Sequence, residues 1–146
     1  MHRRLHVSLL MILVFGACAP EPAVQAPEAV TFTIEGRSGE GPDVVMAVTS
    51  AVGLEYFQTQ RIPVLRGRLF TASDDRAASP VALINEELAA RAFPNMDSIG
   101  RRIKPGGPAS TSPWLTVIGV VGNGKTASRE PAKPHVYTCS LQGVKG

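Results

Sequence analysis

The side chains that build metal sites and disulfide frameworks are scarce in this sequence. It contains two cysteines, Cys18 and Cys139, and three histidines, of which His135 alone lies beyond the first ten residues. A zinc site needs four clustered donors, or three donors and a water molecule, and a Ser-His-Asp site needs a base with an orienting partner. We therefore expect no metal, no cofactor and no hydrolytic centre, and at most one disulfide, between the two cysteines.

An excess of charge of one sign is also missing. The chain has 15 basic and 12 acidic residues, a formal net charge of +3 and a pI of about 9.2. Arg3 and Arg4 lie in a segment that we expect to be removed, and without them the balance is 13 against 12. Such a balance gives no reason to expect nucleic-acid binding. Hydrophobic residues make up 44% of the chain, enough for the core of one globular domain.

No apolar run of the sequence is long enough to span a membrane. The longest, Val7–Ala17, would extend about 16 Å as a helix, against a hydrocarbon core of about 30 Å. Arg3 and Arg4 precede this run, and small residues close it. A basic start, a short apolar stretch and a small-residue exit are typical of a secretory signal peptide, which we place at residues 1–17.

Cys18 follows directly, at the position where a bacterial lipoprotein signal has its lipidated cysteine. The sequence F-G-A-C at 15–18 resembles that motif, although Leu is usual where Phe15 stands. Ordinary cleavage near Cys18 without a lipid, and a misassigned start codon, are the alternatives. If Cys18 is lipidated, Ala19 favours the outer membrane by the same resemblance, and the proline-rich residues 18–30 form an extended tether. Cys139 would then have no cysteine to pair with.

Strand patterns dominate the rest of the chain. Period-two alternation and β-branched runs predict strands at 30–35, 44–49, 62–65, 81–84, 100–104 and 114–121, with an edge strand at 136–138. Asn85 is a good N-cap for a helix that Pro94 ends after Phe93, and a shorter helical segment fits residues 53–60. Few short helices among many strands indicate an α+β fold with a small mixed or antiparallel sheet.

Residues 119–126 match the phosphate-loop pattern G-x-x-x-x-G-K-T. Such a loop cradles phosphates with backbone N–H groups and presents its Lys and Thr from the start of a helix. Here Pro131 and Pro134 follow within nine residues of Lys125, which leaves about one and a half helical turns. No apolar strand ends in the second, metal-binding Asp. We interpret the segment as a strand that enters a glycine-rich turn, and nucleotide binding is the less favoured alternative.

Five motifs occur in a familiar order along the chain. They are G-L-E-Y-F at 53–57, I-P-V-L-R-G-R-L-F at 62–70, P-V-A-L-I-N-E at 80–86, F-P followed by D-S-I-G-R-R-I at 93–103, and W-L-T-V-I-G-V-V-G at 114–122. In this order they resemble the periplasmic core domain of macrolide-exporter-type (MacB-like) ABC permeases, and E-P at 130–131 with V-Y at 136–137 continues the likeness. We place this core domain, as a partial copy, at residues 31–142.

The resemblance implies a periplasmic location and a domain without catalytic residues. Domains of this family couple membrane motion to envelope partners or substrates. The family's transmembrane helices and ATPase find no counterpart in these 146 residues, so the resemblance does not imply transport itself. We expect a non-enzymatic envelope module, anchored through lipid on Cys18, that binds an envelope protein or a transporter complex through exposed strand edges. The alternative is a fragment of a permease gene without a role of its own.

Four residues are candidates for the interaction surface of such a module. Arg66 and Arg68 flank Gly67, Arg101 belongs to an alternating strand pattern, and Trp114 opens a strand beside a loop. The plainer interpretation is that the arginines are solvated and that the indole is half-buried at the edge of the core.

Other noticeable side chains have structural interpretations. We expect the aromatic residues Tyr56, Phe57 and Phe70 to pack in the core and not to form a contact surface. Asp74 and Asp75 precede an arginine in a turn-like stretch, where capping or solvation is sufficient to explain two carboxylates.

Overall fold

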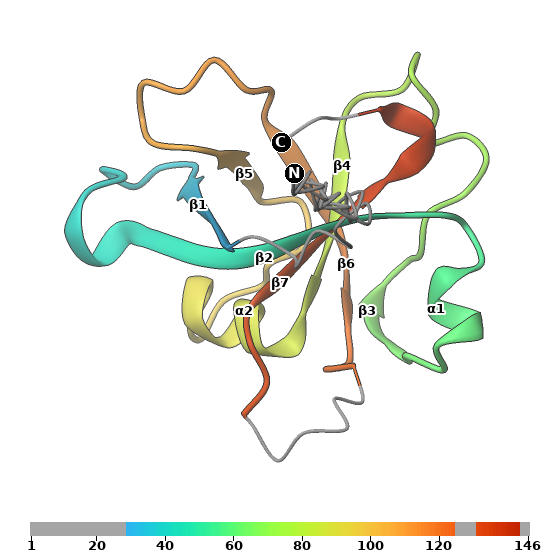
Figure 1. Cartoon of the computed structure of the whole chain (residues 1–146). Coiled ribbons are helices and arrows are strands. Elements are labelled where there is room, and N and C mark those ends of the chain that lie inside the picture. Colours follow the sequence, from blue (N-terminus) through green and yellow to red (C-terminus); the bar gives the residue numbers. More distant parts are fainter. Residues whose placement is uncertain (1–28, 125–130, 144–146) are drawn as a thin grey trace, which may run out of the picture.

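The computed structural model describes residues 29–124 and 131–143, which form one seven-stranded sheet with short helical segments (Figure 1). The strands are β1 (Ala29–Ile34), β2 (Val44–Val52), β3 (Val64–Gly67), β4 (Val81–Asn85), β5 (Arg102–Pro105), β6 (Leu115–Val121) and β7 (His135–Cys139). The helices are α1 (Tyr56–Thr59) and α2 (Glu86–Ala92), and the 3-10 turns are η1 (Gly41–Asp43) and η2 (Ser140–Gln142). The predicted α+β fold class is confirmed.

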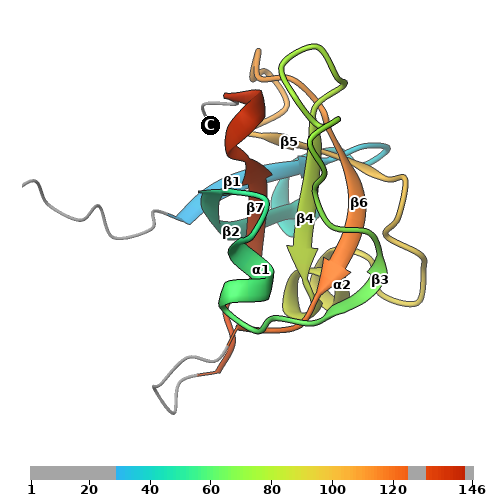
Figure 2. The same ribbon diagram turned by 90° about the vertical axis from the view of Figure 1, so that its right-hand side faces the viewer.

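The sheet curls until β5, at one end of it, meets β6. Its strand order is β3-β6-β4-β7-β2-β1-β5, and β5 pairs with β1 on one side and with β6 on the other. The contact of β5 with β6 runs through Arg102 opposite Thr116 and Ile103 opposite Leu115. Figure 2 shows the resulting wrapped shape, in which β6 stands beside both β4 and β3. The closure leaves β3 as an outlying strand on the β6 edge.

β7 is a central strand, and its prediction as an edge strand was wrong. It runs parallel to β2 on one side and antiparallel to β4 on the other. Four of its residues, Val136 to Cys139, are buried. Its two partner strands come from distant segments of the chain, and Pro134, just before the strand, contributes its carbonyl oxygen, which accepts from Val48 N at 2.9 Å.

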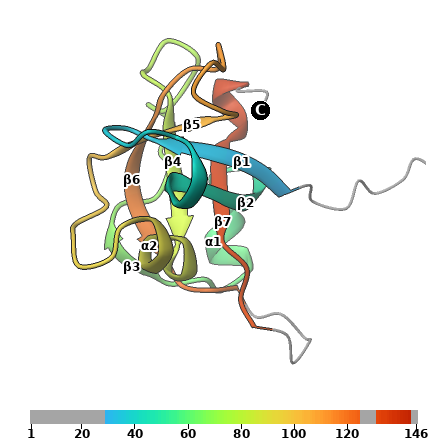
Figure 3. The same cartoon turned by 90° about the vertical axis from the view of Figure 1, so that its left-hand side faces the viewer.

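Two apolar clusters lie on opposite faces of the central strands β4, β6 and β7. Alternate residues of each strand enter different clusters, as the two-residue period of a strand requires; in β4, Ala82 and Ile84 join one and Val81 and Leu83 the other. α2 covers the first cluster at one end of the curled sheet (Figure 3). α1 and the segment leading to Phe70 cover the second. Both faces of β4 are therefore buried.

The strand-to-helix step at Asn85 was predicted correctly. The Asn85 side-chain oxygen accepts from Leu88 N at 3.0 Å, which caps α2, and from His135 N at 2.9 Å. Its amide group donates to Lys133 O at 2.8 Å. α2 ends at Ala92, next to Phe93 and the following proline. One buried side chain thus fixes the start of α2 to the strand β7, and this fixes one wall of the site described below.

Candidate functional site

β3 has an unpaired edge within the described ranges, where its partner strand is β6 alone. A bulge at Leu65 interrupts the antiparallel register. All four residues of β3 are exposed, with Val64 at 40% and Leu65 at 47%. The strand begins later than predicted because Ile62 is buried and its N–H bonds to Phe57 O at 2.9 Å. Two branched apolar side chains therefore face water on a free sheet edge, which proteins normally avoid.

Gly67 brings β3 into close contact with β6. Its φ is +71°, and a Cβ built there would overlap the carbonyl oxygen of Ile118 and lie 2.8 Å from Cα of Gly119. A residue with a side chain does not fit. Arg68 N donates to the same Ile118 oxygen at 3.1 Å. The close approach holds the backbone at Arg66 and Arg68 in one conformation.

Arg68 is part of a two-pronged ion pair, and the expectation that it is simply solvated was wrong. Its guanidinium donates to both oxygens of Asp74, at 2.8 and 3.0 Å, and Thr71 N donates to the same carboxylate at 2.8 Å. Asp74 is 4% exposed. The hydrogen bonds from Arg68, and those from Thr71, lower the pKa of the Asp74 carboxyl below its usual value. The pair pins the turn that follows β3.

The two neighbouring carboxylates differ in role. Asp74 is buried against Arg68, so its predicted solvation was wrong, although its carboxylate does accept a backbone N–H, from Thr71, in the turn. Asp75 is exposed and accepts from Ala77 N at 2.9 Å and Ala78 N at 3.2 Å, which is the predicted turn-capping role. Sequence spacing alone could not separate them, because only the turn between Arg68 and Asp74 brings the guanidinium onto the carboxylate of Asp74 and not onto that of Asp75.

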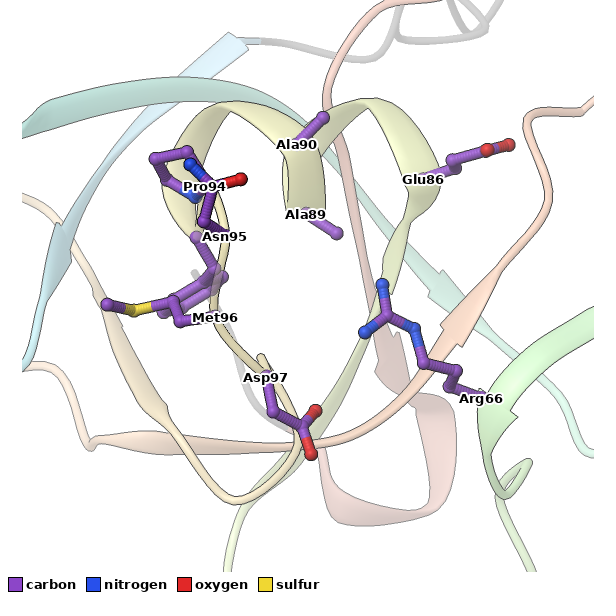
Figure 4. Close-up of a pocket in the computed structure, with 9 residues that line it drawn as sticks. Arg66, Glu86, Ala89, Ala90, Pro94, Asn95, Met96 and Asp97 are labelled. Carbon is purple, nitrogen blue, oxygen red and sulfur yellow. The ribbon is translucent and has the colours of Figure 1, made fainter.

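Arg66 projects into a hollow of about 720 Å³ (Figure 4). We call it the Arg66 hollow; its lining is Arg66, three residues of α2 (Glu86, Ala89, Ala90) and the segment 93–97. In Figure 4 the guanidinium points inward and the Asp97 carboxylate lies at the other wall, while Glu86 points away. Within the described residues, the Arg66 side chain forms no ion pair. A guanidinium without an ion-pair partner among the described residues therefore stands opposite α2 and the segment 93–97.

The far wall of the hollow is a tight turn after α2. Asn95 has a positive φ of 59°, and Asp97 Oδ1 accepts from Ile99 N at 3.0 Å. Met96 is 46% exposed at this wall. The sequence prediction placed Arg66 among its candidates but missed Asp97, because the two residues come together through α2 and the pairing of β3 with β6.

Trp114 lies apart from Arg66. Trp114 immediately precedes β6, whereas Arg66 pairs with Val120 near the end of that strand, so the two are separated by about 20 Å at 3.3 Å per residue. Arg101 is exposed, and its backbone oxygen accepts from Val117 N at 2.8 Å. Trp114 therefore does not share one site with Arg66, whereas Arg66, Arg68 and Arg101 follow one another along the same edge of β6.

Trp114 is half-buried, as predicted, and two cations lie over its ring. Lys104 Nζ is 5.0 Å and the Arg102 guanidinium carbon 5.7 Å from the ring centroid. Lys104 donates to Pro108 O at 2.9 Å, and Arg102 pairs with Glu35, lowering the pKa of that carboxyl. These partners are already engaged, so the cluster serves the packing of β5 against β1 and β6.

His135 has a partner that the sequence did not reveal. Its Nε2 lies 2.9 Å from Ser50 Oγ, because β2 and β7 run side by side in parallel. Burial lowers the pKa of His135 from 6.5 to about 4.

Tyr56, Phe57 and Phe70 pack in the second cluster, as predicted, and Tyr137 joins them. In the described part of the chain, no group of three or more His, Cys, Asp or Glu side chains is placed so that it could hold a metal ion.

The phosphate-loop pattern has a packing explanation at its first glycines. A Cβ at Gly119 would lie 2.6 Å from Leu83 Cδ2, and one at Gly122 would lie 3.1 Å from Pro63 Cγ. Asn123 turns back to accept from Glu87 N at 3.2 Å at the start of α2. Lys125 and Thr126, which complete the pattern, lie outside the described residues.

The segment predicted as a signal peptide, residues 1–17, and Cys18 also lie outside the described residues. In the ranges 29–124 and 131–143, no helix has the length and apolarity to cross a membrane.

The fold is similar to those of extracytoplasmic domains of known transporters. The periplasmic region of MacB from Actinobacillus actinomycetemcomitans matches with a TM-score of 0.58 and 18% identity, over 79% of this chain and 45% of that chain. The extracellular domain of the noncanonic ABC-type transporter YknZ from Gram-positive bacteria matches with a TM-score of 0.55 and 18% identity, over 77% of this chain and 50% of that chain. The chain thus spans about half the length of these structures. No curated protein matches it.

These likenesses show that the chain shares the fold of such domains. The family model for the MacB-like periplasmic core domain matches residues 12–138, and the chain belongs to that family. The predicted family is therefore confirmed, and with it the relation to periplasmic and extracellular domains of transporter permeases. The match begins at residue 12, inside the run that we assigned to a signal peptide.

Proposed function

We propose that this protein is a non-catalytic docking module of the cell envelope, which binds a protein component of an ABC-type transporter assembly. Its family and fold support the setting. The observation that carries the proposal is the free edge of β3, where Val64 and Leu65 are 40% and 47% exposed. A strand edge offers unpaired backbone donors and acceptors to an extended segment of a partner.

The edge is built to take one short strand. Pro63 precedes it and the bulge at Leu65 interrupts it, and both features discourage unlimited strand addition. Gly67 ends it, because there the chain turns close against β6. A specific partner gains from such an edge, since apolar side chains exposed in the free protein become buried on binding.

We also propose the cellular location and the membrane anchor that the sequence indicates. Lipid on Cys18 would anchor the protein, with the outer membrane as the favoured location and residues 18–30 as a tether. Radioactive palmitate should label the wild-type chain in its native host but not the variant Cys18→Ser, and the variant should leave the membrane fraction. Equal labelling, or membrane retention of the variant, would show that the anchor is elsewhere.

Crosslinking in the native host tests the docking role. The photoreactive residue p-benzoylphenylalanine replaces Leu65 in one strain and Met46 in another; Met46 is 60% exposed on β2, away from the free edge. We expect light to produce one defined product at position 65, absent at 46, whose partner is identified by mass spectrometry as an extracytoplasmic part of a transporter. Equal products at both positions, products with unrelated proteins, or none at position 65 would reject the proposal.

A further inference from the structure

The Arg66 hollow lies between β3 and α2, and its two inward-facing charged groups stand on opposite walls. The Arg66 guanidinium points in from β3, and the Asp97 carboxylate lies at the wall formed by the segment 93–97 (Figure 4). No ion pair joins these two groups, and Glu86 points away. An occupant therefore meets one positive and one negative group that are not already matched to each other.

The rest of the lining is largely apolar. Phe93 is buried at it, and Met96 is 46% exposed. Apart from Glu86, α2 contributes only the methyl groups of Ala89 and Ala90, which leave the space open. The volume of about 720 Å³ lies within the range of small-molecule sites, about 300 to 1,000 Å³.

The walls of the hollow are held in place by hydrogen bonds and close packing. Glu87 N donates to Asn123 Oδ1 at 3.2 Å, which ties the start of α2 to the residues after β6. Gly67 holds β3 close against β6 on the opposite side. Asp97 Oδ1 accepts from Ile99 N at 3.0 Å, which orients the carboxylate. A site with fixed walls loses little conformational entropy when a ligand binds.

We propose that the Arg66 hollow binds a small ω-amino acid, a zwitterion whose carboxylate and ammonium groups are joined by an apolar stem. The carboxylate accepts from the Arg66 guanidinium, whose fork of donors matches two carboxylate oxygens. The ammonium group donates to Asp97, and the stem covers Met96, which removes apolar surface from water. This inference goes beyond the docking function, since neither Val64 nor Leu65 of the free strand edge lines the hollow.

Other small ions fit the hollow less well. A dicarboxylate would place its second charge near Asp97, and a diamine would place one near Arg66, and like charges repel. An α-amino acid carries both charges next to each other, whereas Arg66 and Asp97 lie beyond ion-pair distance of one another. A ligand that reaches both walls therefore needs a stem between its charges.

NMR of isotope-labelled methionine methyl groups in the full-length chain tests the proposal. Met96 reports on the hollow, and Met46, 60% exposed on β2, is the internal control; the variant Met96→Leu identifies the Met96 signal. The probe is ε-aminocaproate at constant ionic strength. We expect a saturable shift of the Met96 signal alone, with a Kd on the order of 1 mM, because two charge-assisted pairs form at an open site.

Matched probes separate the two charges of the ligand. Caproate lacks the ammonium group, hexylamine lacks the carboxylate, and glycine has both charges without the stem. Caproate and hexylamine should each bind about tenfold more weakly than ε-aminocaproate, as for the loss of one charge-assisted pair. Glycine should be no better than these two, because it reaches one wall only.

Charge variants assign each end of the ligand to its wall. Arg66→Gln should bind ε-aminocaproate no better than hexylamine, and Asp97→Asn should bind it no better than caproate. Arg101→Gln and Glu55→Gln remove exposed charges outside the hollow and should behave as wild type. A Met46 signal at its wild-type position shows that each variant is folded.

A steric variant tests the hollow without changing its charges. Ala90 lines the hollow and is exposed, so Ala90→Leu fills the space without disturbing the core. We expect this variant to weaken the binding of all probes. Ala77→Leu places the same side chain at an exposed position outside the hollow and should leave binding unchanged.

Several outcomes would overturn the inference. They are equal binding of the zwitterion and the one-charge probes, equal losses in Arg66→Gln and Arg101→Gln, no saturable shift of Met96, or an equal shift of Met46. Crosslinking at Leu65 reports on the β3 edge and requires no ligand in the hollow. The docking function and this ligand site can therefore fail separately.

Discussion

The imidazole of His135 stacks on the ring of Tyr137, with centroids 4.1 Å apart and planes 14° from parallel. The contact places an ionisable group against an aromatic face, while Ser50 holds its Nε2. Protonation would put a charge into this largely buried position, and burial therefore lowers the pKa of His135 to about 4. Stability should depend on pH for this reason.

The first prediction concerns the range between pH 6.5 and pH 4. The unfolded chain binds a proton at His135 near pH 6.5, whereas the folded chain resists it down to about pH 4. The unfolded state then binds more protons, so the free energy of unfolding falls as the pH falls, by at most about 3 kcal/mol. Urea unfolding at a series of pH values should show this slope in wild type, and the variant His135→Gln should lack it.

The variant Ser50→Ala serves as the control for the cause of this effect. It removes the hydrogen bond and keeps the imidazole buried, so we expect it to retain the slope. A flat profile in Ser50→Ala would show that the hydrogen bond, and not burial, controls the titration. An unchanged slope in His135→Gln would assign the pH dependence to another group.

The second prediction concerns the buried carboxylate of Asp74. Asp74→Asn should lower the free energy of unfolding at pH 7 by about 1–3 kcal/mol, since it breaks a hydrogen-bonded pair whose acidic member is buried. Because the pKa of Asp74 is lowered on folding, this stabilisation is present above the normal Asp value and disappears as the pH falls below it. Urea unfolding followed by circular dichroism measures the difference.

A surface pair of the same kind provides the comparison for Asp74. Glu87 and Arg91 form an i,i+4 pair on α2 with a 2.6 Å contact, and Glu87→Gln should cost about 0.5 kcal/mol or less. If both variants lower the free energy of unfolding by the same amount, the Arg68–Asp74 pair stabilises the fold no more than a surface ion pair does.

The third prediction concerns the close approach at Gly67. Gly67→Ala should destabilise the protein by more than about 2 kcal/mol, because it adds both a left-handed backbone penalty and a collision with β6. Gly53→Ala is the matched control, since its φ is not in the left-handed range and nothing lies within 4 Å of the added Cβ. Comparable losses in the two variants would contradict the packing of β3 on β6.

The fourth prediction concerns nucleotides. Millimolar Mg-ATP should leave the melting temperature of the full-length chain unchanged in circular dichroism, because Gly119 and Gly122 are explained by contacts with Leu83 and Pro63. A ligand that binds the native state raises the melting temperature by mass action. A rise that grows with ATP concentration would therefore restore the phosphate-loop interpretation of residues 119–126.

Local features were predictable because their causes are local. The alternation in β1, the apolar run of β4 and the Asn85 cap each depend on residues within one short segment. The order of five motifs identified the family for the same reason, since each motif is read along the chain. Where a partner comes from a distant segment, as Ser50 does for His135, no such signal exists.

The sequence by itself determined the fold class, the family and the capped step from β4 into α2, because periodicity, capping and motif order are properties of neighbouring residues. The tertiary structure alone decided that β7 is central, that Asp74 is buried against Arg68, and that Arg66 faces Asp97 across a hollow. The first and third depend on pairings between strands that are distant in sequence, and the second depends on how the turn after β3 folds back. Pairing between distant strands is a long-range property, and periodicity, capping and motif order along the chain do not report it.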